Sequence, residues 1–121
     1  MKENQNTEYK SNFNDSVIET LVAFANTKGG KVLIGVLDNG SPNTNFKFGK
    51  ETFQNWINEI KVKTQPSIIP DLEIIDYNGS NIVEITIPEF PIKPVSFKGR
   101  YYKRVKNSNH QLSVIEIANL N

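Results

Sequence analysis

The segment from residue 16 to residue 36 constrains the fold most, because it joins a helix to a buried strand through two glycines. Ser16 and Glu19 have the spacing of a capping box, which satisfies backbone N–H groups at the start of a helix. Apolar residues then recur every three or four positions, as in an amphipathic helix. Gly29 and Gly30 end this helix, and the apolar run VLIGV that follows predicts a strand buried on both faces. The rest of the chain must pack on this unit of helix, glycine turn and buried strand.

The size and composition of the chain indicate one small globular domain. Its 121 residues suffice for a single core, and 37% hydrophobic residues with 10% aromatics are typical of a folded chain. The sequence has no cysteine, which excludes disulfides and thiolate metal sites and fits a reducing compartment. The N-terminal segment lacks the apolar core of a signal peptide, and no apolar run is long enough to span a bilayer. These features predict a cytoplasmic protein.

The remaining pattern predicts an α+β fold with a mixed or largely antiparallel sheet of about five to six short strands. Two main helices and a short C-terminal helix complete it, and the last helix opens at Ser113 with a second capping box. Asn78-Gly79 is a strong hairpin signal. We expect these further elements: an edge strand at 8–10, a helix at 51–63, and strands at 72–77, 82–87, 95–97 and 100–105. Because the sequence stops soon after the last helix opens, we interpret residues 1–121 as one domain trimmed from a longer protein.

Several strings in the sequence carry a resemblance to a known family. ETLVAFANTKGGKVLIGVLDNG closely resembles the core motif of the Schlafen-type AlbA-like domain, the AlbA_2 family found in Schlafens and bacterial transcriptional regulators. EYK at 8–10, the region of Pro70 and YYKRV at 101–105 are similar to its other landmarks. The resemblance implies a nucleic-acid-binding module, with DNA favoured over RNA, within a transcriptional regulator. A homodimer is expected, because one hairpin gives a small footprint.

A basic hairpin near the C-terminal end independently favours nucleic-acid binding. The net charge is only +1, but residues 90–115 contain six basic side chains and no acidic one. Alternation along the strand at 100–105 places two arginines and a tyrosine on one face, a pattern suited to phosphate contact and base stacking. The predicted binding residues are Lys98, Arg100, Tyr102, Arg104 and Lys106. The alternative is an edge hairpin whose positive charge only prevents aggregation.

Three carboxylates support an alternative function. The Schlafen resemblance implies that a metal-dependent ribonuclease would use Glu3, Glu8 and Asp38, with Mg²⁺ or Mn²⁺ activating water. The structural interpretation is simpler, because Asp38 is a common turn residue and Glu8 can pair with Lys10 or Lys31. We favour that interpretation and expect no resident metal or cofactor.

Other catalytic classes are disfavoured by the order of the elements. Gly29-Gly30-Lys31 ends a helix and precedes a strand, whereas a P-loop connects a strand to the start of a helix, so we exclude an ATPase. His110 is the only histidine and has no nucleophile pattern beside it. A domain without either activity, serving protein interaction or regulation, is the third hypothesis.

Overall fold

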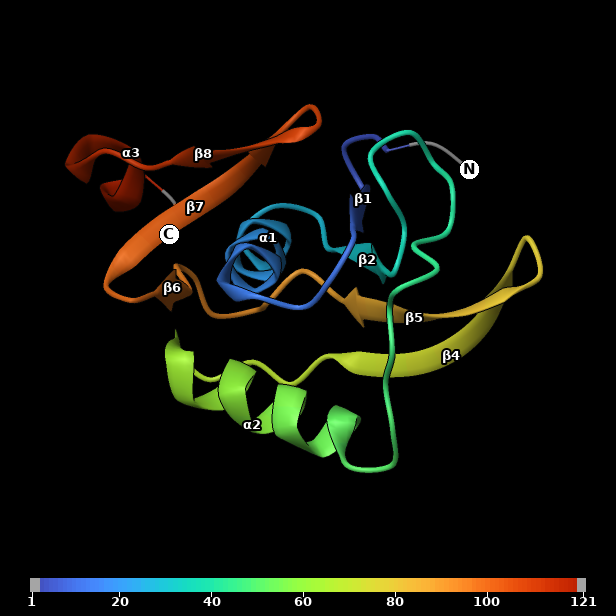
Figure 1. Ribbon diagram of the computed structural model, residues 1–121. Helices are drawn as coiled ribbons and strands as arrows, with labels where there is room; N and C mark the ends of the chain where they lie inside the picture. The colour runs from blue at the N-terminus through green and yellow to red at the C-terminus, as the bar shows by residue number, and fades with distance from the viewer. Residues whose placement is uncertain (1–2, 120–121) are drawn as a thin grey trace.

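The computed structural model describes residues 3–119, which form two four-stranded sheets and three helices, with the first helix at the centre (Figure 1). The helices are α1 (Asp15–Ala25), α2 (Thr52–Lys63) and α3 (Val114–Ala118). The strands are β1 (Thr7–Lys10), β2 (Gly30–Ile34), β3 (Thr64–Gln65), β4 (Asp71–Tyr77), β5 (Ser80–Ile87), β6 (Ser96–Phe97), β7 (Arg100–Val105) and β8 (Ser108–Gln111). No helix in this described part is long and apolar enough to cross a membrane.

The α+β class is confirmed, but the strands form two sheets rather than one. The first sheet has the order β1-β2-β5-β4, with β1 parallel to β2 and the other pairs antiparallel. The second has the order β3-β6-β7-β8 and is antiparallel throughout. The proline-rich segment 88–94 separates β5 from β6, because proline cannot donate to a sheet ladder.

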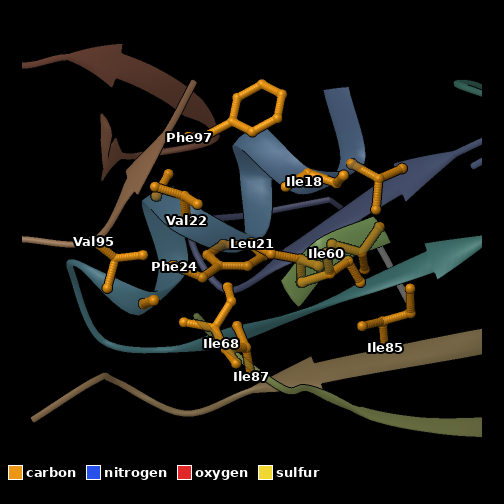
Figure 2. Close-up of a cluster of buried hydrophobic side chains, with 14 of the residues drawn as sticks. Ile18, Leu21, Val22, Phe24, Ile60, Ile68, Ile85, Ile87, Val95 and Phe97 are labelled. Atoms are coloured by element: carbon orange, nitrogen blue, oxygen red, sulfur yellow. The ribbon is translucent and has the colours of Figure 1, made fainter. Parts of the chain in front are cut away.

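Helix α1 is the central element because it contacts both sheets. All its residues from Val17 to Ala25 except Glu19 are buried, so the helix is enclosed nearly all round rather than on one stripe. Its apolar side chains meet β2 and β5 on one side and β6 and β7 on the other. Figure 2 shows Leu21 and Phe24 at the middle of this cluster. The position of α1 therefore sets the relative placement of the two sheets.

The start of α1 differs from the predicted capping box. Asn14, not Ser16, is the N-cap: its backbone is extended, and its Oδ1 accepts hydrogen bonds from the backbone N–H and the hydroxyl of Ser16. Glu19 instead accepts from Asn109 of β8 at 3.0 Å. The prediction at Ser16 is wrong because the residue two positions earlier is an equally good cap. The box at Ser113 and Glu116 is confirmed.

Asn26 joins the C-terminal end of α1 to the second sheet. Its side-chain amide donates to the carbonyl oxygens of Val95 and Tyr102, both at 2.8 Å, and its Oδ1 accepts from the Val95 N–H at 2.7 Å. The hydroxyl of Thr27 accepts from the backbone N–H of Arg104. Polar residues at the end of a helix usually bond nearby backbone, and Thr27 does donate to the carbonyl of Ala23, but both residues also bond segments about seventy residues away. They dock the hairpin of β6 and β7 on α1.

Both predicted hairpins form, and a third was missed. Asn78 and Gly79 have positive φ between β4 and β5, as do Lys98 and Gly99 between β6 and β7, which matches two-residue hairpin turns. A further hairpin joins β7 to β8 through Lys106, which also has positive φ. Strand β8 reads SNHQ, so neither apolar alternation nor β-branched residues identify it in the sequence.

Candidate nucleic-acid interface

The predicted binding face of β7 points mostly into the protein. Arg100, Tyr102 and Arg104 do share one face of the strand, but this face packs on α1. Tyr102 is 8% exposed and Arg104 is 4% exposed, whereas Arg100 at the beginning of the strand is exposed. The prediction of a solvent-facing stripe is therefore wrong at Tyr102 and Arg104. The alternation identified the shared face but not which face was buried.

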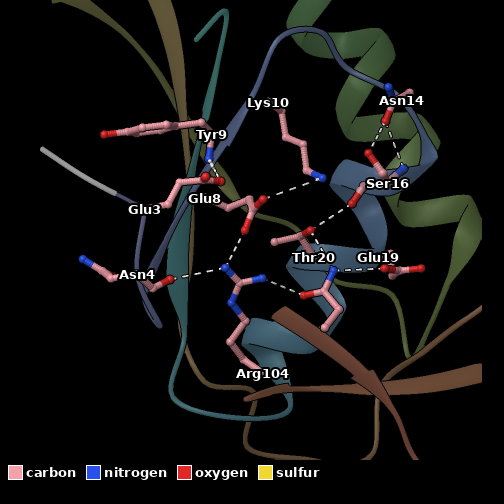
Figure 3. Close-up of polar contacts among 11 residues, drawn as sticks. Glu3, Asn4, Glu8, Tyr9, Lys10, Asn14, Ser16, Glu19, Thr20 and Arg104 are labelled. Atoms are coloured by element: carbon pink, nitrogen blue, oxygen red, sulfur yellow. Dashed lines mark hydrogen bonds and ion pairs between the residues drawn. The ribbon is translucent and has the colours of Figure 1, made fainter. Parts of the chain in front are cut away.

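Arg104 is held in a polar network between β1 and β7 (Figure 3). Its guanidinium forms an ion pair with Glu8 of β1 and donates to Asn109 Oδ1 at 2.8 Å and to the carbonyl of Asn4 at 3.3 Å. The group also lies over the ring of Phe24, 4.9 Å from the centroid. Its Nε is buried and has no hydrogen-bond partner in residues 3–119. Arg104 is thus committed to internal contacts.

The carboxylates predicted for the alternative function are only partly brought together. Burial raises the pKa of Glu8, opposed by the hydrogen bond from Arg104 and reinforced by the neighbouring carboxylate of Glu3. Glu3 in turn accepts a hydrogen bond from the backbone N–H of Tyr9 at 3.0 Å. Asp38 is exposed in the turn after β2, and no group of three His, Cys, Asp or Glu able to hold a metal occurs within residues 3–119. Glu3 and Glu8 lie together without Asp38.

The expected pairing of Glu8 with a nearby lysine is seen with Lys10, at 3.9 Å. Lys31 pairs instead with Glu84 of β5, at 3.4 Å. The Glu8–Lys10 contact joins two residues of β1, whereas the Lys31–Glu84 contact is a cross-strand pair between β2 and β5.

The fold pairs most of the basic segment with acidic residues from other parts of the chain. Four of its six basic side chains have carboxylate partners: Lys93 with Glu89, Lys98 with Asp15, Lys103 with Glu116, and Arg104 with Glu8. The other two, Arg100 and Lys106, are exposed and form no ion pair with any described residue. These two cations are the part of the basic hairpin that is available to a polyanion.

A hollow lies beside the hairpin, where the first turn of α1 approaches β6 and β7. Its lining combines acidic, basic and aromatic side chains: Asp15, Glu19, Phe97, Lys98, Arg100 and Tyr102. Asp15 was not a candidate from the sequence, because an acidic residue in the first turn of a helix is common. Asn109 was also missed, because it lies in a polar segment without a recognisable pattern.

The fold and these contacts define a class: small α+β domains in which one buried helix joins two sheets. Residues 3–113 match the Schlafen, AlbA_2 family, and the chain belongs to that family. The expectation from the sequence motifs is thereby confirmed.

Two solved structures share the fold. The DIP2311 protein from Corynebacterium diphtheriae superposes with a TM-score of 0.70 at 18% identity, over 89% of this chain and 22% of that one. The N-terminal domain of a protein from Nitrosomonas europaea, named as related to the ATP-dependent DNA helicase RecG, gives 0.60 at 21% identity, over 90% of this chain and 82% of that domain. The chain thus spans about a fifth of the C. diphtheriae protein. No curated protein matches the sequence.

Proposed function

We propose that this domain binds nucleic acid, with duplex DNA favoured over RNA, as a module of a transcriptional regulator. The observation that carries the proposal is a pair of exposed cations, Arg100 and Lys106, which form no ion pair within residues 3–119 and lie on the hairpins of β7 in a Schlafen AlbA_2 domain. The similarity to a domain named for its relation to a DNA helicase supports the same class of ligand.

Arg100, Lys106 and Lys98 are proposed to contact phosphates directly. The planar guanidinium of Arg100 suits bidentate contact with a phosphate. Lys106 lies six residues further along, or about 20 Å at the usual rise of a strand, so it would reach a different phosphate. Tyr102 and Arg104 act as positioning residues, because their buried contacts hold β7 on α1. So few contacts would give weak, salt-sensitive binding with little sequence specificity.

The test is fluorescence anisotropy with a short labelled DNA duplex at several salt concentrations. Arg100→Gln should weaken binding about tenfold, as expected for one charge-assisted contact, and reduce the salt slope by about one. Lys61→Gln is the matched control, because Lys61 on α2 is also exposed and forms no ion pair within residues 3–119. Equal losses in the two variants would place the interface elsewhere.

Two other functions have an observation in their favour. The adjacent carboxylates of Glu3 and Glu8 support the alternative of a metal-dependent ribonuclease, with Mg²⁺ or Mn²⁺ as its metal. Cleavage of structured RNA that requires Mn²⁺ and is lost in Glu8→Gln would establish it. Val114 and Ile115 of α3, 82% and 75% exposed, favour a protein-interaction domain, with a homodimer as the proposed assembly. Light scattering of the purified chain would detect the dimer.

A further inference from the structure

Asp15 connects three segments that are distant in the sequence. This first residue of α1 contacts Lys63, the last residue of α2, with 2.8 Å between Oδ1 and Nζ. Its other carboxylate oxygen contacts Nζ of Lys98, in the turn between β6 and β7, at 2.5 Å. One carboxylate thus holds two ammonium groups, one on each oxygen.

The contact is open to solvent and lies at the proposed interface. The side chains of Asp15 and Lys98 are 42% and 57% exposed, and that of Lys63 is 32% exposed. Asp15 and Lys98 line the same hollow as Arg100, the exposed arginine that forms no ion pair in the described part of the chain. Another anion can therefore reach these cations without any rearrangement of the core.

The cations around Asp15 form an environment that favours an anion. The hydrogen bond from Lys63, followed by that from Lys98, holds the pKa of Asp15 below its usual value. Lysine ammonium groups contact phosphate oxygens in the same way as carboxylate oxygens, as charge-assisted hydrogen bonds. Lys63, Lys98 and Arg100 would thus form a phosphate subsite if the carboxylate were absent.

We propose that Asp15 is an internal competitor for phosphate, whose carboxylate occupies the place between Lys63 and Lys98 that a nucleic-acid phosphate would take. The inference rests on the proposed function, because it concerns the affinity of that same interface. Binding exchanges one anion for another at Lys98, so this lysine contributes little net affinity in the wild type. Replacing Asp15 by a neutral residue frees Lys98 beside Arg100 and leaves Lys63 with Glu59 as its remaining carboxylate contact.

The test compares Asp15→Asn with Glu59→Gln in the whole chain, using the labelled duplex between about 50 and 200 mM salt. The two variants remove the same charge, and both carboxylates are 42% exposed and contact Lys63, but only that of Asp15 contacts Lys98. Asp15→Asn should tighten binding about threefold to tenfold at low salt and steepen the salt slope by about one. Glu59→Gln should change affinity less than about twofold.

Each outcome decides between the two proposals. Equal effects of Asp15→Asn and Glu59→Gln on affinity, or weaker binding by a folded Asp15→Asn variant, would overturn the proposal that Asp15 competes with phosphate. The proposed nucleic-acid interface would not be affected by that result. Failure of both the wild type and Asp15→Asn to bind the duplex would overturn both proposals.

A second comparison avoids any dependence on the folding of Asp15→Asn. Lys98→Gln in the wild type should cost less than about twofold in affinity, against about tenfold for Arg100→Gln. A loss in Lys98→Gln as large as that in Arg100→Gln would show that Lys98 is already available to phosphate and would overturn the inference.

Discussion

Two ion pairs attach the second sheet to the N-terminal part of the chain, and they differ in burial. Glu8 and Arg104 are 16% and 2% exposed at the side chain, whereas Asp15 and Lys98 are 42% and 57% exposed. The first pair bridges β1 and β7 next to the ring of Phe24. The second bridges the start of α1 and the turn between β6 and β7.

Both carboxylates are attracted by their cations, but the difference in burial shifts their pKa values in opposite directions. At Glu8 the loss of solvation outweighs the attraction of Arg104, so the pKa is raised. At Asp15 the two lysines outweigh a small loss of solvation, so the pKa is lowered. A buried charge becomes costly when its partner is removed, while an exposed one is readily rehydrated. We therefore assign Glu8–Arg104 to the structure and Asp15–Lys98 to the regulation of binding.

The largest expected effect is that of Arg104→Ala on stability. The change leaves the half-buried Glu8 with only the more distant Lys10 as a cation, and it removes one donor each from Asn109 Oδ1 and from the carbonyl of Asn4, so it should cost about 3 to 5 kcal/mol. Lys103→Ala is the control, because the adjacent Lys103 forms a more exposed pair with Glu116 and should cost less than about 1 kcal/mol. Urea unfolding measures both, and similar losses would remove the distinction between buried and exposed pairs.

The second prediction uses pH to compare the two carboxylates. The pKa of Glu8 is raised above 4.5, so its contribution to stability is greatest below pH 4.5 and is lost as pH rises through the folded pKa. The pKa of Asp15 is lowered below 3.8, so its contribution is present above pH 3.8 and is lost as pH falls through the folded pKa.

The two isosteric variants should therefore show opposite pH dependence. Glu8→Gln should destabilise more at pH 4.5 than at pH 7, whereas Asp15→Asn should destabilise more at pH 7 than below pH 3.8. Chemical unfolding at each pH gives the two free-energy differences. If the destabilisation by the two variants changed with pH in the same direction, burial could not be the main cause of the pKa shift at Glu8.

The smallest expected effect concerns α3, which buries none of its side chains among the described residues. Glu116 caps this helix and contacts Lys103 at 3.0 Å, and the N–H of Ser113 is the largest cause of its pKa of about 2. Its contribution is present above pH 4.5 and is lost as pH falls toward 2. Glu116→Gln should speed amide exchange in α3 and leave that of α1 unchanged, and equal protection in both proteins would contradict this role.

Local patterns in the sequence predicted most elements of the fold. The helix at 15–25, the buried strand after the glycines and the two hairpins with Asn-Gly and Lys-Gly turns all depend on neighbouring residues. Strand β8 and the N-cap Asn14 were missed, because a polar edge strand has no periodic signal and two residues only two positions apart could each cap the helix. The family, too, could be identified from strings of consecutive residues.

The sequence by itself thus determined most of the secondary structure, the family and the fact that Arg100, Tyr102 and Arg104 share a face. Only the tertiary structure decided that this face packs on α1, because alternation defines two faces of a strand without saying which one is buried. The tertiary structure also decided which basic side chains remain available to a nucleic-acid phosphate. Lys98 and Arg104 are paired with Asp15 and Glu8, about eighty and a hundred residues away, and such long-range contacts leave no local pattern to detect.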